Sequence, residues 1–408
     1  MQSVATLLTD EDFMTTPTPA GQYLHIRFTG SGSEYFRIWI VNVLLTIVTL
    51  GLYHPWAKAR RLRYFHGNTL VGGHPMGFHG EPIQMLKGSL LVAAFLLAYV
   101  FVGGVSPGLQ ALMTLAALAA MPALTRSALR FRITHTSWRG LRFGFSGTMA
   151  QAYRSHWPIL AAFASVVALT ILASAAVSGA SRANRLEGVL VVAVLSLSMP
   201  ITMGVIPLWW HRQARYRMEH ANFAGVWVRM KAAAGEFYGA LVGTAGVSML
   251  ATVPAVLVIC LMPLTAATSD DPGLQQMLRP QALQSTTWWT AAILAFCYLL
   301  AVCAGKAYHA SRMQNIVWGS AEGDQIRFQS RLGFLPMLTL YMKNGLLTVL
   351  SLGLYWPFAQ VALARLRLEA VSAELFTDVD ALVSGQRGGS AHATGDAGVD
   401  AFRIDVGL

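Results

Sequence analysis

Two pairs of polar residues recur at the same spacing in distant parts of the chain. Asn42 and Thr46 lie four residues apart in an apolar run, and Asn344 and Thr348 repeat the pair beside Lys343. Residues four apart share one face of a helix, so each pair forms a polar stripe. Such a stripe can line a polar path through a membrane protein. It can equally hydrogen-bond between helices and hold them together, and the sequence leaves both interpretations open.

Arginine residues form three clusters, each just beyond an apolar run, and aromatic residues interleave with them. Clusters of this kind bind the phosphate head groups of anionic lipids. The alternative is that these clusters only anchor the helix ends at the membrane surface and set the orientation of the helices in the membrane. The clusters are Arg60, Arg61 and Arg63, then Arg126, Arg130 and Arg132, then Arg212, Arg215 and Arg217.

Other chemistry is poorly supported. Four histidines crowd residues 54–79, but their spacing matches no compact zinc pattern, so we expect no metal site. The chain has no Gly-x-Ser-x-Gly or His-Glu-x-x-His motif. The Gly-rich stretch Gly30–Ser33 lacks the lysine of a phosphate-binding loop. We therefore expect no enzymatic activity and no cofactor.

Composition indicates the elements that must carry these residues. Hydrophobic residues make up 54% of the chain and charged residues 12%, about half the 25% of a soluble protein. This composition, with a mean hydropathy of +0.49, predicts a polytopic membrane protein. The net charge of +11 then reflects basic cytoplasmic loops, and we expect no nucleic-acid partner.

Six apolar runs are long enough to cross a bilayer, and two more are shorter and interrupted by polar residues. We therefore expect six to eight hydrophobic helices. None of the six interiors contains Asp or Glu, which disfavours a carboxylate-based proton pump. The six runs are 86–104, 107–125, 158–178, 188–210, 237–263 and 287–305, and the two interrupted runs are 36–57 and 336–359.

Charge alternates between the connecting segments. Segments 57–85, 126–157, 211–236 and 306–335 carry 4, 6, 5 and 4 Lys or Arg. The segments between them, 103–107, 179–187 and 264–286, carry 0, 2 and 1. Lys and Arg collect in cytoplasmic loops, so this alternation places the basic loops in the cytoplasm.

An internal repeat relates the two ends of the chain. Residues 42–57 align with residues 344–359, with ten of sixteen positions identical at an offset of 302. We interpret this as a duplication of segments 36–57 and 336–359. The domain organisation that follows is an N-terminal tail over 1–22, a membrane domain over 23–380, and a flexible C-terminal tail over 381–408. Within that tail, Ser384–Gly398 is rich in Gly, Ser and Ala and is typical of a tether.

Short runs of alternating aromatic and β-branched residues follow several helices and predict strands. If all strands share one cap on the cytoplasmic side, segments 36–57 and 336–359 have both of their flanks on that side. They would then be re-entrant, entering the membrane and returning to the side from which they start. The alternative is eight full spans with both termini outside and the repeats inverted. The predicted fold is an all-α polytopic bundle with a small cytoplasmic cap of strands at Leu24–Thr29, Met76–His79, Leu141–Phe145, Gly225–Val228, Ile326–Gln329 and Ala401–Val406.

Four segments together resemble one bacterial family. The stretch Phe28–Phe36, the Thr49–Ala57 segment, Arg139–Phe145 and the closing Asn344–Ala359 repeat are similar to the YjgN-like inner-membrane proteins, over about residues 22–380. His54 departs from the family pattern between Tyr53 and Pro55. The resemblance implies a multi-pass protein of the bacterial inner membrane and carries no functional residues, because the family's activity is unknown.

Two functions are compatible with these patterns. The first is transport of a small solute or lipid-like molecule, supported by the broken segments with their Asn and Thr stripes. The second is a membrane scaffold or anionic-lipid-binding protein, supported by the arginine clusters. The expected partners are the lipid bilayer and anionic head groups.

Overall fold

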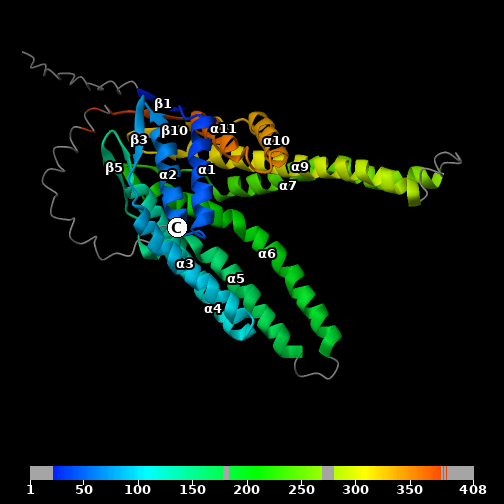
Figure 1. Ribbon diagram of the computed structural model, residues 1–408. Coiled ribbons are helices and arrows are strands. Elements are labelled where there is room, and N and C mark those ends of the chain that lie inside the picture. The colour runs from blue at the N-terminus through cyan, green and yellow to red at the C-terminus, as the bar shows by residue number, and fades with distance from the viewer. Residues whose placement is uncertain (1–21, 178–182, 269–279, 378–379, 381–382, 384–408) are drawn as a thin grey trace, which may run out of the picture.

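In the computed structural model, helical hairpins alternate with short strands that gather into one sheet (Figure 1). The structure describes residues 22–177, 183–268, 280–377, 380 and 383. The helices are α1 Gly32–Val48, α2 His54–Gly67, α3 Pro82–Gly103, α4 Pro107–Thr134, α5 Met149–Val177, α6 Ala183–Glu219, α7 Ala234–Thr268, α9 Pro280–Gly319, α10 Phe334–Leu350 and α11 Trp356–Glu369.

The strands are all short, and the whole sheet is antiparallel. Its order is β7-β6-β5-β4-β3-β2-β1-β11-β10-β9-β8. The strands are β1 Gln22–Phe28, β2 Thr69–Val71, β3 His74–Phe78, β4 Thr136–Trp138, β5 Leu141–Phe145, β6 Ala221–Phe223, β7 Val226–Trp227, β8 Arg229–Met230, β9 Ala321–Glu322, β10 Ile326–Ser330 and β11 Val371–Leu375.

The sheet almost closes into a ring. The first and last strands of the order, β7 and β8, are separated along the chain by Val228 alone. A side chain on Gly323, between β9 and β10, would collide with the carbonyl of Trp227, so β7 lies against the turn that follows β9, the neighbour of β8. The first and last strands of the chain pair within this ring, with Gln22 opposite Leu375 and His25 opposite Ser372.

The ring encloses its own hydrophobic core. Leu24, Trp138, Ala373 and Leu375 are at most 6% exposed and pack together. Partly buried side chains from other strands cover this cluster, among them Met76, Phe143, Phe223, Ile326 and Phe328. Because alternate residues of a strand face opposite sides, one apolar residue in two is enough to fill this interior.

Three long hairpins extend away from the sheet, α3–α4 and α5–α6 in similar directions and α7–α9 in another (Figure 1). Two short hairpins, α1–α2 and α10–α11, lie against each other through α1 and α11. Every hairpin leaves from one strand and returns to another. The expected all-α fold with a small cap is therefore wrong in one respect, because eleven strands join the hairpins into a single ring.

Four returning helices contain a buried proline, and its position in the helix differs between the long and the short hairpins. Pro122 and Pro207 lie inside α4 and α6, which continue through them. Pro55 and Pro357 instead stand in the first turn of α2 and α11, after a break in the helix. All four prolines are almost fully buried. A proline at the start of a helix loses no hydrogen bond, so the break costs little there.

In the described part of the chain, four helices are long and apolar enough to cross a membrane, fewer than the six to eight expected. Segments 36–57 and 336–359 fall short because α1 and α10 have 17 residues each, about 26 Å of helix against a core of about 30 Å. The expected spans 158–178 and 188–210 lie on α5 and α6, where many side chains are outside the description. The four are Pro82–Gly103, Gly108–Thr134, Ala234–Leu257 and Ala291–Gly319.

The structure contains five of the six predicted strands, as β1, β3, β5, β7 and β10. The sixth, Ala401–Val406, and the predicted tether Ser384–Gly398 lie outside the described residues, as does nearly all of the 1–22 tail. Segments 36–57 and 336–359 each cover most of the first helix and the break of a short hairpin. The hairpins α1–α2 and α10–α11 both start and end at strands of the sheet, which is the arrangement that the re-entrant alternative requires.

Candidate functional site

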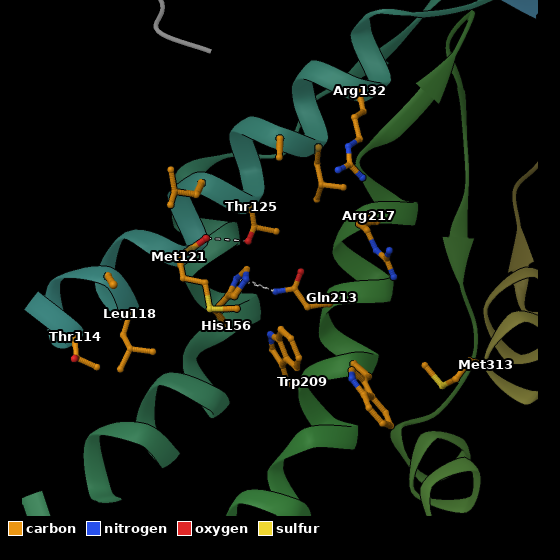
Figure 2. Close-up of a pocket in the computed structure, with 15 residues that line it drawn as sticks. Thr114, Leu118, Met121, Thr125, Arg132, His156, Trp209, Gln213, Arg217 and Met313 are labelled. Carbon is orange, nitrogen blue, oxygen red and sulfur yellow. Dashed lines mark hydrogen bonds between the residues drawn. The ribbon is translucent and has the colours of Figure 1, made fainter. Parts of the chain in front are cut away.

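A cavity of about 680 Å³ lies between the long hairpins, at their end nearest the sheet. Helices α4, α5, α6 and α9 all contribute to its wall (Figure 2). The volume falls within the range of about 300–1,000 Å³ that holds small-molecule ligands in proteins. No Asp or Glu is found among the described residues that line it.

Two arginines give one end of the cavity a positive charge. Arg132 comes from the last turns of α4 and Arg217 from those of α6. Figure 2 shows their guanidinium groups on the same side of the cavity, above His156 and Gln213. A guanidinium keeps its charge and presents several donors in a fixed plane, which suits carboxylates and phosphates.

A buried histidine and glutamine form the middle of the wall. His156 is fully buried, its Nδ1 lies 2.8 Å from the carbonyl oxygen of Ala152, and its Nε2 lies 2.8 Å from Nε2 of Gln213. A ring nitrogen must donate to a carbonyl, so we assign the proton to Nδ1 and leave Nε2 to accept from Gln213. Burial lowers the pKa of His156, which favours this neutral form.

Apolar side chains line the opposite end. Leu118 and Met121 come from α4, whereas Trp209 comes from α6 (Figure 2). Leu124 and Trp210 of the same two helices also line the cavity. The indole nitrogen of Trp209 is buried and has no hydrogen-bond partner among the described residues. The cavity thus combines a cationic end, one available indole donor and an apolar remainder, which matches a molecule with an anionic group and a hydrocarbon part.

Some of the arginines predicted to bind lipid instead donate hydrogen bonds to the backbone where a strand meets the next hairpin. At each of the five junctions between a strand and the next hairpin, a side chain from a returning helix donates to a backbone carbonyl. In four of them this helix belongs to the preceding hairpin, and at the first junction it is α11, near the other end of the chain. Two of these donors, Arg63 and Arg126, belong to the predicted lipid-binding clusters. The five bonds run from Arg63 to Gly80 (3.2 Å), Arg126 to Gly147 (2.7 Å), His211 to Ala232 (3.1 Å), Asn315 to Leu332 (2.9 Å) and Arg365 to Gly30 (2.9 Å).

The remaining predicted arginines are dispersed over the helices. Arg60 lies over the ring of Tyr53, and Arg212 lies over Trp157 and donates to the carbonyl of Arg154. Arg215 pairs with Glu219 one turn later on α6. Arg130 is partly buried on α4, and Arg61 lines a second, smaller cavity. The structure therefore brings together Arg132 and Arg217 but does not form one surface from all nine.

The two Asn-Thr pairs do not share a cavity. Asn42 and Thr46 line the smaller cavity beside Arg61. Asn344 is buried and donates to the carbonyl of Ala359 at 3.4 Å, a bond between α10 and α11. Lys343 is exposed, and Thr348 is partly buried on α10. The packing interpretation thus suits Asn344, whereas Asn42 is buried and lines the smaller cavity.

His156, Gln213 and Trp209 were not predicted as site residues from the sequence. His156 and Gln213 are 57 positions apart and belong to no motif. The only sequence signal is their place one or two turns from the ends of apolar runs, which many residues share. Among the described residues, no group of three or more His, Cys, Asp or Glu gathers in a way that would hold a metal ion.

Comparison with known proteins gives a consistent assignment. A family model described as "Bacterial protein of unknown function (DUF898)" matches residues 23–401. The inner membrane protein YjgN of Salmonella typhimurium is 24% identical over 347 residues, covering 82% of this chain and 84% of that protein. YjgN of Escherichia coli O157:H7 is 34% identical over 123 residues, covering 30% and 31%. No solved structure matches the chain.

These findings confirm the resemblance deduced from the four motifs. The relatives are named as inner membrane proteins, and the described helices include four able to cross a bilayer, so this is a helical protein of the inner membrane. The chain therefore belongs to the DUF898 family of bacterial proteins and is similar to the YjgN inner membrane proteins.

Proposed function

We propose that the protein transports a lipid-like anion, which it binds in the cavity between α4, α5, α6 and α9. The observation that carries the proposal is the division of this cavity into an end with Arg132 and Arg217 and an end with Leu118, Met121 and Trp209. An anionic group would contact the guanidinium pair, and hydrocarbon would occupy the apolar part. The proposal includes no chemical step on the ligand.

The charge distribution supports an orientation for this transport. The basic segments 57–85, 126–157, 211–236 and 306–335 contain strands β2 to β10 and the parts of the helices next to them. Most Lys and Arg of the chain therefore belong to the segments that form the sheet. We propose that the sheet lies in the cytoplasm. Arg132 and Arg217 would then lie near the cytoplasmic surface, and the apolar end of the cavity would lie deeper in the bilayer.

The test is flux of a fluorescent anionic phospholipid in liposomes that contain the purified protein. We expect the wild-type protein to move the lipid between leaflets, and the double variant R132Q/R217Q to be at least tenfold slower. Loss of one hydrogen bond to a charged group, at about 1.5–3 kcal/mol, already corresponds to this factor. Arg215→Gln is the matched control, since Arg215 lies two residues from Arg217 but pairs with Glu219 outside the cavity.

The possible results separate the two candidate functions. Equal rates for wild-type protein and R132Q/R217Q would exclude the cavity as the path. Binding of the lipid by the wild-type protein without any flux would exclude transport and favour a lipid-binding scaffold.

A further inference from the structure

A second cavity, of about 280 Å³, lies in the short hairpin α1–α2 and is closed on one side by Trp356 of α11. Its wall combines aromatic, amide and cationic side chains, and none of its described lining residues is Asp or Glu. The polar residues are Asn42 and Thr46 from α1, with Lys58 and Arg61 one turn apart on α2. Its volume suits a head group rather than a complete lipid.

The positive charge of Lys58 in the wall of this cavity lies in an unfavourable environment. Burial lowers the pKa of Lys58, and the positive charges of Arg132 and Arg61 lower it further. Bringing like charges together in a partly buried place costs free energy. An anion in the cavity would offset that cost by interacting with Lys58 and Arg61 at the same time.

Asn42 adds an unsatisfied acceptor to the cavity wall, whereas its counterpart Asn344 has the same unsatisfied Oδ1 but lines neither of the two cavities. Its side chain is 6% exposed and lines the cavity, yet its Oδ1 has no hydrogen-bond partner among the described residues. A buried polar atom left unsatisfied costs about 1–3 kcal/mol. A ligand that carries a hydroxyl group or an amine beside its anionic group would satisfy this oxygen.

The equivalent hairpin α10–α11 shows that the fold does not need these cations. At the offset of 302, Gln360 replaces Lys58, Leu363 replaces Arg61 and Trp356 replaces His54. In that hairpin Leu363 packs against a core of fully or largely buried side chains that includes Met337 and Leu332. The two hairpins thus share one backbone arrangement. In α10–α11 the space at this position is packed with apolar side chains, whereas in α1–α2 it is a cavity with cationic side chains in its wall.

The surroundings indicate a lipid as the source of the ligand. Val48 at the end of α1 and Leu50 in the break that follows are 79% and 94% exposed. Apolar residues this exposed need a hydrocarbon environment. Trp39 and Trp356 line the cavity beside this end, and tryptophan is the residue that favours the level of the head groups.

We propose that the cavity formed by Asn42, Lys58, Arg61, Trp39 and Trp356 binds the phosphate head group of an anionic phospholipid that bears hydroxyl groups. The phosphate would contact Lys58 and Arg61, and a hydroxyl would donate to Asn42. This site is separate from the cavity between α4 and α6 and does not depend on transport.

Titration calorimetry of the full-length protein in neutral detergent tests the proposal, with dihexanoyl phosphatidylglycerol as the probe. The variant K58Q/R61L installs the residues that the chain itself uses at 360 and 363. We expect wild-type protein to bind the probe and K58Q/R61L to bind it at least tenfold more weakly. Its melting temperature should stay level or rise, because like charges are removed from a partly buried place. The variant Arg217→Gln should keep the affinity, because Arg217 lines the larger cavity and not this one. This result would distinguish the site from the transport cavity. Arg132 is left unchanged in this control, since its charge acts on Lys58.

Two further probes identify the source and the chemistry. Glycerol phosphate supplies the same head group without a lipid, and we expect weaker binding, since it lacks the hydrocarbon next to Val48 and Leu50. Equal affinity for glycerol phosphate would overturn the assignment to a lipid. Dihexanoyl phosphatidylcholine, which has no hydroxyl and no net charge, should not bind. Unchanged affinity in K58Q/R61L, or no binding of phosphatidylglycerol by the wild-type protein, would overturn the site.

Discussion

Arginine residues within a single helical turn have different tasks in this protein. Arg61 and Arg63 are two residues apart on α2, but Arg61 lines the smaller cavity while Arg63 donates to the carbonyl of Gly80. Arg126 and Arg132 divide in the same way, between the carbonyl of Gly147 and the larger cavity. Neighbouring positions of a helix point about 100° apart. The face of the helix on which an arginine lies therefore decides whether it lines a cavity or donates to a backbone carbonyl.

This division limits what the sequence can reveal at the scale of residues. The clusters of Arg and aromatic residues were recognisable from composition and spacing alone. Which arginine reaches a carbonyl and which reaches a cavity depends on the direction of the next hairpin, and no local pattern records that. The buried pair of His156 and Gln213 was missed for the same reason, since its two members come from different helices.

His156 should make the stability of the protein depend on pH. Burial lowers its pKa in the folded state below the ordinary value of about 6.5. Between the two values the unfolded chain binds a proton that the folded chain does not, so stability is full above about pH 6.5 and falls as the pH decreases through it. We expect the melting temperature in detergent to decrease between about pH 7 and pH 5.

The variant His156→Asn tests this assignment, because it removes the titrating group. It should lose less of its melting temperature over the same range than the wild-type protein does. Part of the dependence should persist, since burial also lowers the pKa of His66 and His211. The same pH dependence in both proteins would contradict a role for His156.

At the scale of elements, the two short hairpins adopt the same break residue by residue. Leu50 and Gly51 have φ angles of 50° and 91°, and Leu352 and Gly353 have 50° and 92°. The backbone amide of Gly51 donates to the backbone carbonyl of Thr46 at 2.7 Å, and the backbone amide of Gly353 donates to the backbone carbonyl of Thr348 at 2.8 Å. These bonds end each first helix with a left-handed turn, which glycine adopts without strain.

Replacing these glycines should weaken both hairpins. A Cβ at Gly51 or Gly353 would meet no atom within 4 Å, so the cost comes only from the left-handed backbone. We expect Gly51→Ala and Gly353→Ala each to lower the free energy of unfolding by about 1–2 kcal/mol. Gly239→Ala in α7 is the control, because that glycine also has open space but no left-handed φ, and it should be neutral or stabilising.

Denaturation in mild detergent, followed by the loss of helical signal, would measure these differences. Equal effects at Gly51 and Gly239 would contradict the explanation from backbone conformation.

The sequence predicted the position of nearly every long helix, because an apolar run of about twenty residues is an unambiguous signal. It missed strands β2, β4, β6, β8, β9 and β11. Five of these have only two or three residues, too few to show alternation. The exception is β11, whose five residues alternate between buried and partly buried and could have been recognised.

At the scale of the whole molecule, the ring of strands was not predictable from any one segment. The sequence predicts one shared cap for its six expected strands, because isolated strands need partners, but it does not indicate the order in which they pair. Closure depends on pairing between β1 and β11 and on contact between Trp227 and Gly323, both of which join distant parts of the chain. Such pairings arise from the sum of all hairpin directions, so local propensity contains little information about them.

The ring makes a clear prediction for membrane topology. β1 and β11 lie in the same sheet, so both ends of the described chain are on one side. We expect a fluorescent reporter fused after Leu408 to be active in the cytoplasm, and a phosphatase at the same position to be inactive. A phosphatase inserted at Val105, between α3 and α4, should be active because that connection lies at the far end of the hairpin. An external C-terminus would contradict the cytoplasmic position of the sheet.

The pairing of β1 with β11 also determines when the protein can be completed during synthesis. A chain is made from its N-terminus, so β1 emerges first and its partner β11 emerges almost last. Until then Gln22–His25 present an unpaired edge, to which another chain could add a strand. All five hairpins must therefore be inserted while the ring is still open. A translation arrest or truncation before Val371 would leave a product that has membrane helices in place but an edge exposed to aggregation and proteolysis.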